Sequence, residues 1–131
     1  MKIAIDTSAI LAILLDEDIN KSIVKMTIGF EIVSAATLPY EVGNALVSNL
    51  RKRRITEPQA LLALKNFEKM NIRFIGIDMQ DSILMASKLG IYAYDSYILS
   101  VALKLKIPLI TLDKLMIESA KVSGIKVVEV Y

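Results

Sequence analysis

The chain has 131 residues, the size of a single domain built around one hydrophobic core. It contains no cysteine and no histidine, which excludes disulfide bonds, thiolate or imidazole metal sites, cysteine nucleophiles and every catalytic triad that relies on imidazole. A formal net charge of +2 permits a phosphate-rich partner without requiring one.

Five short runs rich in isoleucine and valine alternate with segments long enough to form helices. The runs lie at residues 2–5, 32–34, 74–77, 108–112 and 126–130. Their apolarity is continuous rather than alternating, which indicates strands that are buried on both faces of a parallel sheet. We therefore predict one domain over residues 1–131 with an α/β fold, in which helices cover both faces of about five parallel strands.

The segments between these runs show helical spacing of apolar residues and end at recognisable signals. Residues 38–70 hold two consecutive helical patterns with no strand between them, so this pair could project from the sheet as an arm. Thr56 is a predicted N-cap with Pro58 just inside its helix, and Gly90 and Gly124 are predicted helix C-termini.

The share of hydrophobic residues is 54%, which is high for one small domain. Charged residues interrupt every apolar stretch before it reaches the roughly 18 residues of a membrane-spanning helix, and Asp6 breaks the only segment that resembles a signal peptide. We therefore expect a cytoplasmic protein that makes no membrane contact. The excess of apolar residues predicts a shared surface, most simply that of a homodimer.

Two acids directly follow predicted strands. Asp6 comes after the strand at 2–5 and Asp113 after the strand at 108–112. Open parallel sheets bind ligands at the carboxyl ends of their strands, so both carboxylates are expected in one crevice. Asp78 also follows a strand, but with Asp81 three residues later it is more typical of a helix cap with an acid in the first turn.

Two further acids are candidates for the same crevice. Asp95 opens a predicted helix at 94–106, where its carboxylate either caps the helix or points into the crevice. Glu41 shares with Ala45 a mostly apolar helix face, where a carboxylate is costly unless it is paired or binds a metal ion. Asn44 is in a position to orient Glu41 or a bound water molecule.

The order and spacing of these four acids resemble those of PIN-domain nucleases, and most closely those of the small VapC-type toxins. The resemblance covers nearly the whole chain and rests on four segments: IAIDTSAILAILL, PYEVGNAL, YDSYILSVALKLKIPLITLDKLM and IKVVEV. It implies a PIN-like fold in which Asp6, Glu41, Asp95 and Asp113 coordinate one or two Mg²⁺ or Mn²⁺ ions.

The same resemblance implies supporting residues and partners. Thr7 or Ser8, together with Thr111, would help to orient the ligands. An RNA substrate, a cognate antitoxin and a homodimer would be its partners. Some members carry a further acid shortly after the last one, where this chain has Lys114. Because of this departure, the number of metal ions bound, one or two, stays open.

The predicted function is metal-dependent hydrolysis of RNA. Because cleavage through the 2′-hydroxyl usually relies on imidazole, attack by a metal-activated water is favoured, which leaves 5′-phosphate and 3′-hydroxyl ends. A receiver-like phosphoacceptor domain is an alternative, but it would need tandem acids where this chain has Asp6, Thr7 and Ser8. A haloacid-dehalogenase-type phosphatase would need an acid in place of Ser8. A catalytically silent RNA- or partner-binding module is the third alternative.

Two sets of residues suggest contacts with RNA. The basic run of Arg51, Lys52, Arg53 and Arg54 is either a solvated helix end or a phosphate clamp at the mouth of the acidic crevice. Tyr92, Tyr94 and Tyr97 are close to Asp95 in sequence and either stack on bases or pack in the core. For Tyr97 we predict packing, because it falls on the apolar face of its helix.

Overall fold

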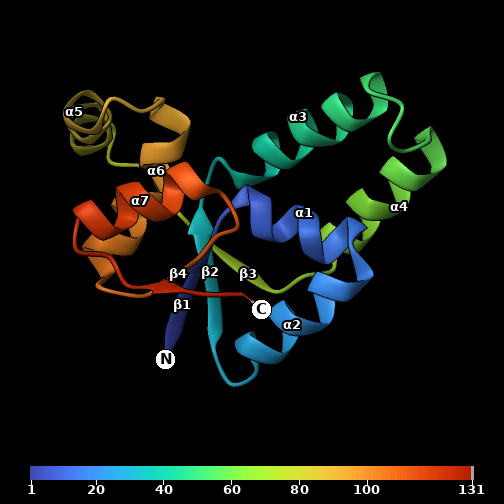
Figure 1. Ribbon diagram of the computed structural model, residues 1–131, viewed down its shortest axis with the longest axis horizontal. Coiled ribbons are helices and arrows are strands. Elements are labelled where there is room, and N and C mark those ends of the chain that lie inside the picture. The colour runs from blue at the N-terminus through green and yellow to red at the C-terminus, as the bar shows by residue number, and fades with distance from the viewer. Residues whose placement is uncertain (131) are drawn as a thin grey trace.

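A parallel sheet forms the centre of the molecule (Figure 1). The computed structural model describes residues 1–130, the side chain of Glu17 excepted. Within them the strands are β1 (Lys2–Ile5), β2 (Glu31–Ala35), β3 (Ile72–Ile75), β4 (Leu109–Ile110) and β5 (Val127–Val128). All neighbouring strands pair in parallel in the order β3-β2-β1-β4-β5, which confirms the predicted sheet.

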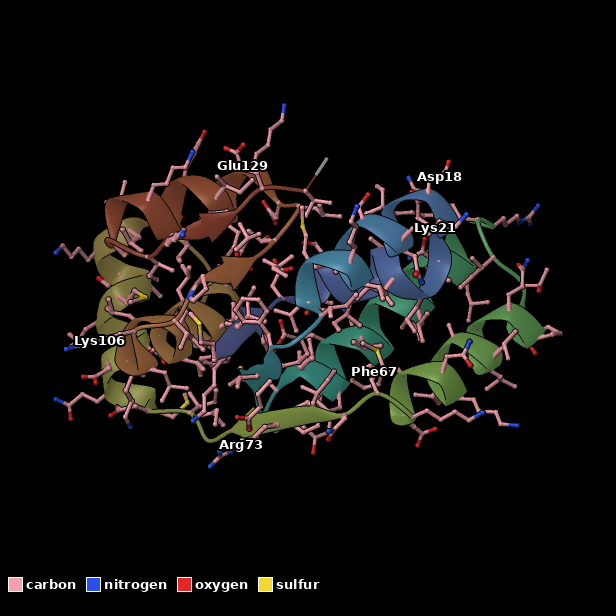
Figure 2. All side chains as sticks on the ribbon, turned by 90° about the horizontal axis from the view of Figure 1, so that it is seen from below. Asp18, Lys21, Phe67, Arg73, Lys106 and Glu129 are labelled. Carbon is pink, nitrogen blue, oxygen red and sulfur yellow. The ribbon has the colours of Figure 1, made fainter. Side chains whose placement is uncertain are left out.

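Helices cover both faces of this sheet, as predicted. They are α1 (Thr7–Leu15), α2 (Glu17–Thr27), α3 (Leu38–Arg51), α4 (Glu57–Glu68), α5 (Met79–Leu89), α6 (Ala93–Leu105) and α7 (Lys114–Val122). Residues of α1–α4 pack with Ile3 and Ile5 on one face, whereas residues of α5–α7 pack with Ala4 on the other. Figure 2 shows these two groups of helices on opposite sides of the strands, with Phe67 of α4 in the first group.

The predicted strand at 74–77 is wrong by two residues, since β3 spans Ile72–Ile75. This strand lies at the edge of the sheet and pairs only with β2, in a register that sets Ile72 beside Ile32. β2 and β3 end at the same level, so residues beyond Ile75 have no strand to pair with. Because its outer edge is open, Phe74 is 43% exposed, and apolarity alone could not locate the strand.

The helix boundaries follow the predicted capping signals. Thr56 and Gln59 form a reciprocal capping box at the start of α4, and Gly90 ends α5 in the left-handed conformation with φ of 67°. Asp78 caps α5 by accepting a hydrogen bond from the Asp81 amide, as expected. Figure 1 shows α3 and α4 extending from the sheet as the predicted arm.

None of the helices described is long and apolar enough to cross a membrane.

The hydroxyl of Ser82 in α5 is fully buried, and among the described residues nothing bonds to it. A buried hydroxyl without a partner costs about 1–3 kcal/mol, so Ser82→Ala is expected to raise the free energy of unfolding by about 1 kcal/mol. Ser96 in α6 is an equally buried control whose Oγ donates to the Ala93 carbonyl at 2.7 Å. Urea denaturation of both variants should show a gain for Ser82→Ala and a loss for Ser96→Ala. Equal losses would contradict this prediction.

Candidate functional site

The predicted acids meet where the connectivity of the sheet changes direction. The chain proceeds from β1 to β2 and β3 on one side, and β4 and β5 lie on the other side of β1. Parallel sheets bind ligands at the carboxyl ends of strands beside such a switch point. Here there is a small cavity of about 80 Å³. Its lining includes all four predicted acids, namely Asp6, Glu41, Asp95 and Asp113.

Asp6 is the most deeply placed of the four, with only 4% of its surface exposed. Its Oδ1 accepts hydrogen bonds from the Ala9 amide, which makes it the N-cap of α1, and from the Ser8 hydroxyl at 2.7 Å. Thr111 donates its hydroxyl to Oδ2. Burial raises the pKa of Asp6, these hydrogen bonds oppose the shift, and the charge of Asp113 adds to it.

Two hydroxyls tie the end of β1 to the end of β4. Ser8 Oγ accepts from the Leu112 amide at 3.0 Å, and Thr111 Oγ1 accepts from the Asp113 amide at 3.1 Å. Asp113 in turn caps α7 through the amides of its first turn. The predicted supporting hydroxyls therefore hold Asp6 and Asp113 in a fixed relation across neighbouring strands.

Glu41 lies in the first turn of α3 and is held by two threonines. Thr7 Oγ1 donates to its Oε1 at 3.3 Å, and Thr37 Oγ1 donates to its Oε2 at 2.8 Å. Burial raises the pKa of Glu41, while the two hydroxyls oppose the shift and the charge of Asp95 adds to it. Asn44 is exposed and does not line the cavity, so the orienting contacts expected of it are made by Thr7 and Thr37 instead.

Thr37 was not predicted from the sequence, although a signal was available. It precedes α3 as the N-cap, and its side chain makes no capping bond to the backbone. A threonine four residues before an acid at a helix start brings the two side chains onto the same face. This spacing could have identified Thr37 as a partner of Glu41.

Asp95 is the third residue of α6 and points into the cavity. The N-cap of this helix is Tyr92, so the capping role considered for Asp95 is not observed. Burial, followed by the charge of Asp113, raises the pKa of Asp95. Among the described residues no donor bonds to its carboxylate, which leaves both oxygens available to a ligand.

The donor set fits a hard divalent cation. The cavity is lined by carboxylates, hydroxyls and apolar groups, and no lysine or arginine is among the described lining residues. Oxygen ligands of this kind select Mg²⁺ or Mn²⁺. No three acids among the described residues are grouped closely enough to form a complete ligand cluster. A cation held here would keep several water molecules, as Mg²⁺ usually does.

The basic run lies at the other end of α3 from Glu41. This helix has 14 residues and is therefore about 20 Å long, with Arg51 as its last residue. Lys52, Arg53 and Arg54 follow in the exposed loop before α4. The run is thus at the tip of the arm, as expected of a solvated helix end, and not at the mouth of the cavity, as a phosphate clamp would require.

The three tyrosines near Asp95 differ in their burial. Tyr97 is half-buried and packs against the core between α6 and the sheet, which confirms the packing prediction. Tyr92 and Tyr94 are exposed.

Comparisons with known proteins agree with this architecture. The family model of the PIN domain matches residues 3–122. The fold is similar to that of PAE2754 from Pyrobaculum aerophilum, with a TM-score of 0.73 and 23% identity over 97% of this chain and 83% of that chain. None of the curated proteins matches the chain.

Two solved toxin–antitoxin structures also share the fold. One is VapBC2 from Rickettsia felis, bound to a DNA fragment from its promoter, with a TM-score of 0.71 and 13% identity over 100% of both chains. The other is a toxin–antitoxin complex from Klebsiella pneumoniae, with a TM-score of 0.61 and 17% identity over 99% of this chain and 98% of that chain.

Proposed function

The chain belongs to the PIN domain family, and on this premise we propose that it is a Mg²⁺- or Mn²⁺-dependent endoribonuclease and the toxin of a toxin–antitoxin pair. The observation that carries the proposal is that four carboxylates line one small cavity, with no lysine or arginine among its described lining residues. Such a cluster is self-repelling unless it binds a positive ion, and proteins keep such clusters at functional sites. The family match excludes the receiver-like alternative.

The residues of the cavity have different roles in the proposed reaction. A bound divalent ion supplies a Lewis acid for the phosphodiester and lowers the pKa of an attacking water. Asp6 provides a fixed anchor, because Ser8 and Thr111 hold both of its oxygens. Asp95, which no described donor restrains, accepts a ligand most readily. Since the chain has no histidine, no imidazole assists attack by the 2′-hydroxyl.

Cleavage of RNA and the chemistry of the new ends test this function. The purified chain, incubated with RNA and Mg²⁺ or Mn²⁺, is expected to release fragments with 5′-phosphate and 3′-hydroxyl ends, and EDTA should stop the reaction. Cleavage that persists in excess EDTA, or fragments with cyclic 2′,3′-phosphate ends, would overturn the mechanism. A complete lack of cleavage in every cation would favour the silent binding module.

Thr37→Val is expected to weaken Mn²⁺ binding about 10- to 100-fold, the usual cost of losing a group that orients a metal ligand. The substitution removes the hydroxyl that donates to Glu41 at 2.8 Å and keeps the shape of the side chain. Thr37→Ser should restore affinity because it keeps the donor. Thr27→Val removes a hydroxyl from the exposed end of α2 and serves as control. Calorimetric titration with Mn²⁺ measures all three, and equal affinities for Thr37→Val and wild type would refute the role.

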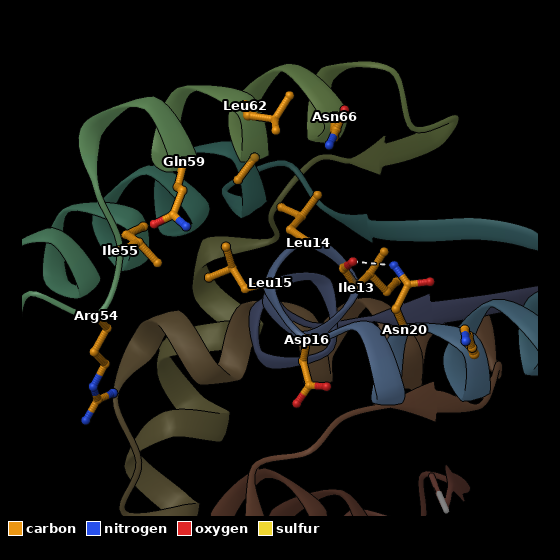
Figure 3. Close-up of a pocket in the computed structure, with 12 residues that line it drawn as sticks. Ile13, Leu14, Leu15, Asp16, Asn20, Arg54, Ile55, Gln59, Leu62 and Asn66 are labelled. Atoms are coloured by element: carbon orange, nitrogen blue, oxygen red, sulfur yellow. Dashed lines mark hydrogen bonds between the residues drawn. The ribbon is translucent and has the colours of Figure 1, made fainter.

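We further propose a cognate antitoxin as the partner that restrains this activity. A groove of about 640 Å³ runs between the end of α1, the start of α2 and the helix α4 (Figure 3). Leu14, Leu15 and Leu62 give it apolar contacts, and Arg54 and Asp16 lie at its borders. An amphipathic helix would bury its apolar face there. The toxin–antitoxin assemblies of similar fold support this proposal.

We also propose that the chain forms a homodimer. Leu84, Leu103 and Val122 come from α5, α6 and α7, border one shallow hollow and are 59%, 44% and 75% exposed. Apolar surface of this kind is commonly buried between two identical subunits. Light scattering of the isolated chain at micromolar concentration should give twice the monomer mass.

The exposed position of the basic run suits contact with RNA away from the cavity. At the tip of the arm, Arg51, Lys52, Arg53 and Arg54 are too far from the acids to hold the phosphate that is cut. We propose that they bind phosphates in a flanking part of the RNA, where exposed cations gain affinity by releasing counterions.

A further inference from the structure

Ser34 is a fully buried polar residue in the apolar part of β2. It lies between Val33 and Ala35, and each of the three residues is at most 1% exposed. Burying a hydroxyl is unfavourable unless the group finds a hydrogen-bond partner, so the partner of Ser34 indicates what the residue does. Ser34 also lines the acidic cavity, together with Asp6.

The hydroxyl of Ser34 links β2 to the last residue of β1. Its Oγ donates to the carbonyl oxygen of Ile5 at 2.6 Å. The last pair in the register of the two strands is Ala4 and Val33, so Ile5 and Ser34 come next in line. A side chain thus carries the connection between the two strands one position further, up to the cavity.

The carbonyl that Ser34 binds belongs to the peptide group joining Ile5 to Asp6. The N–H of the same peptide group, on Asp6, donates to the carbonyl oxygen of Ile110 in β4 at 3.3 Å. A peptide group is planar, so bonds to its C=O and to its N–H hold it as one rigid unit between β2 and β4. The backbone is therefore held on both sides directly before the side chain of Asp6.

This peptide group determines where the carboxylate of Asp6 can lie. Ser8 and Thr111 hold the two carboxylate oxygens, but they act at the far end of the side chain. A rotation of the peptide group would move Cα and Cβ of Asp6 and strain those hydrogen bonds. A binding group that is already held in its bound position loses less conformational freedom when the ligand arrives, which raises affinity.

On the basis of the proposed metal-dependent function, we infer that Ser34 is a positioning residue, which holds the backbone of Asp6 so that its carboxylate is set to receive a divalent cation. β2 contains one hydroxyl-bearing residue, and it stands at the level where the neighbouring strand reaches Asp6. This placement favours a role at the site over a general contribution to stability.

Calorimetric titration of the purified chain with Mn²⁺ tests this role. Ser34→Ala removes the donor, and Ser34→Cys nearly keeps the size of the side chain but offers only a weak donor. We expect both variants to bind Mn²⁺ about tenfold more weakly, at the lower end of the usual cost of losing a group that orients a metal ligand.

Ser96→Ala is the matched control for Ser34→Ala. Ser96 is equally buried and donates to a backbone carbonyl at 2.7 Å, but it does not line the cavity. Both alanine variants lose one buried hydrogen bond, so urea denaturation should show comparable losses of stability. Only the Ser34 variants should lose affinity for Mn²⁺.

Hydrogen exchange of backbone amides provides a readout that needs no cation. The Ala9 amide donates to the carboxylate of Asp6 at 3.0 Å, so its protection reports how firmly this carboxylate is held. In Ser34→Ala we expect the amides of Asp6 and Ala9 to exchange about tenfold faster than in Ser96→Ala, because local opening at the end of β1 becomes easier. The Asp81 amide, which bonds to a different carboxylate in α5, should exchange alike in both variants.

Wild-type affinity for Mn²⁺ in both Ser34→Ala and Ser34→Cys, or an equal loss in Ser96→Ala, would overturn the inference. Unchanged exchange of the Asp6 and Ala9 amides would overturn it as well, even if the chain bound no Mn²⁺. Failure of the nuclease proposal looks different. In that case the wild-type chain would not cleave RNA in any cation, yet the protection of the Asp6 and Ala9 amides would still depend on Ser34.

Discussion

Replacing Asp6 by asparagine is expected to reduce RNA cleavage at least about 10²-fold and to leave the fold more stable at neutral pH. The loss of activity reflects several kcal/mol of stabilisation of the transition state by the metal ion, since each 1.36 kcal/mol of activation free energy changes the rate tenfold. The gain in stability follows from burial, which raises the pKa of Asp6 and makes its ionised form unfavourable. Asparagine keeps an oxygen for the Ala9 amide, so the cap of α1 is preserved.

Asp78→Asn is the matched control for this substitution. Asp78 also follows a strand and caps a helix, but it does not line the cavity. Cleavage rates and urea denaturation of both variants distinguish a carboxylate that lines the cavity from one that only caps a helix. Near-normal cleavage by Asp6→Asn, or an equal loss in Asp78→Asn, would refute the assignment of Asp6.

Divalent cations are expected to raise the melting temperature strongly at neutral pH and hardly at all in acid. Mn²⁺ at 100 times its dissociation constant adds about 2.7 kcal/mol by mass action. In acid the cation competes with protons for Asp6, Glu41 and Asp95. Burial raises the pKa of all three, so this competition begins above the ordinary carboxyl values of 3.8 and 4.5.

The raised pKa values also determine how the free energy of unfolding of the metal-free chain changes with pH. A carboxyl whose pKa is raised by folding holds its proton more tightly in the folded chain. Its contribution to the free energy of unfolding therefore falls as pH rises from 3.8 or 4.5 through the raised folded value. Melting curves with and without Mn²⁺ across this range measure both effects. A melting temperature unmoved by Mn²⁺ at neutral pH would contradict the convergence of these acids on a cation.

The strand β1 was predictable from the sequence, whereas the limits of β4 and of the edge strands were not, since β4 spans only Leu109–Ile110 of the predicted 108–112. β1 pairs on both sides and is buried on both faces, so a continuous apolar run located it at Lys2–Ile5. β3 has one neighbour and one solvated edge, so its limits depend on pairing with β2 and not on its own composition. The same holds for β5 at Val127–Val128, shorter than the predicted 126–130 because it pairs only with the short strand β4.

The acids of the site were predictable because chain order in a parallel sheet fixes which residues share an edge. Asp6 and Asp113 follow strands that prove to be neighbours. Thr37 was missed because its contact with Glu41 depends on the direction in which the first turn of α3 faces the cavity. The sequence left two roles open for the basic run, and the length of α3 decides between them, because it carries the run away from the acids to an exposed helix end.

The hydrogen bond between Thr111 and Asp6 joins residues 105 positions apart, and this separation affects when the site can exist during synthesis. As the chain emerges from the ribosome, β1, β2 and β3 are synthesised well before β4. Until β4 arrives, β1 lacks a partner on one side and Asp6 lacks both the Thr111 hydroxyl and its neighbour Asp113. The acidic cavity is therefore assembled only after residues 109–113 have been synthesised.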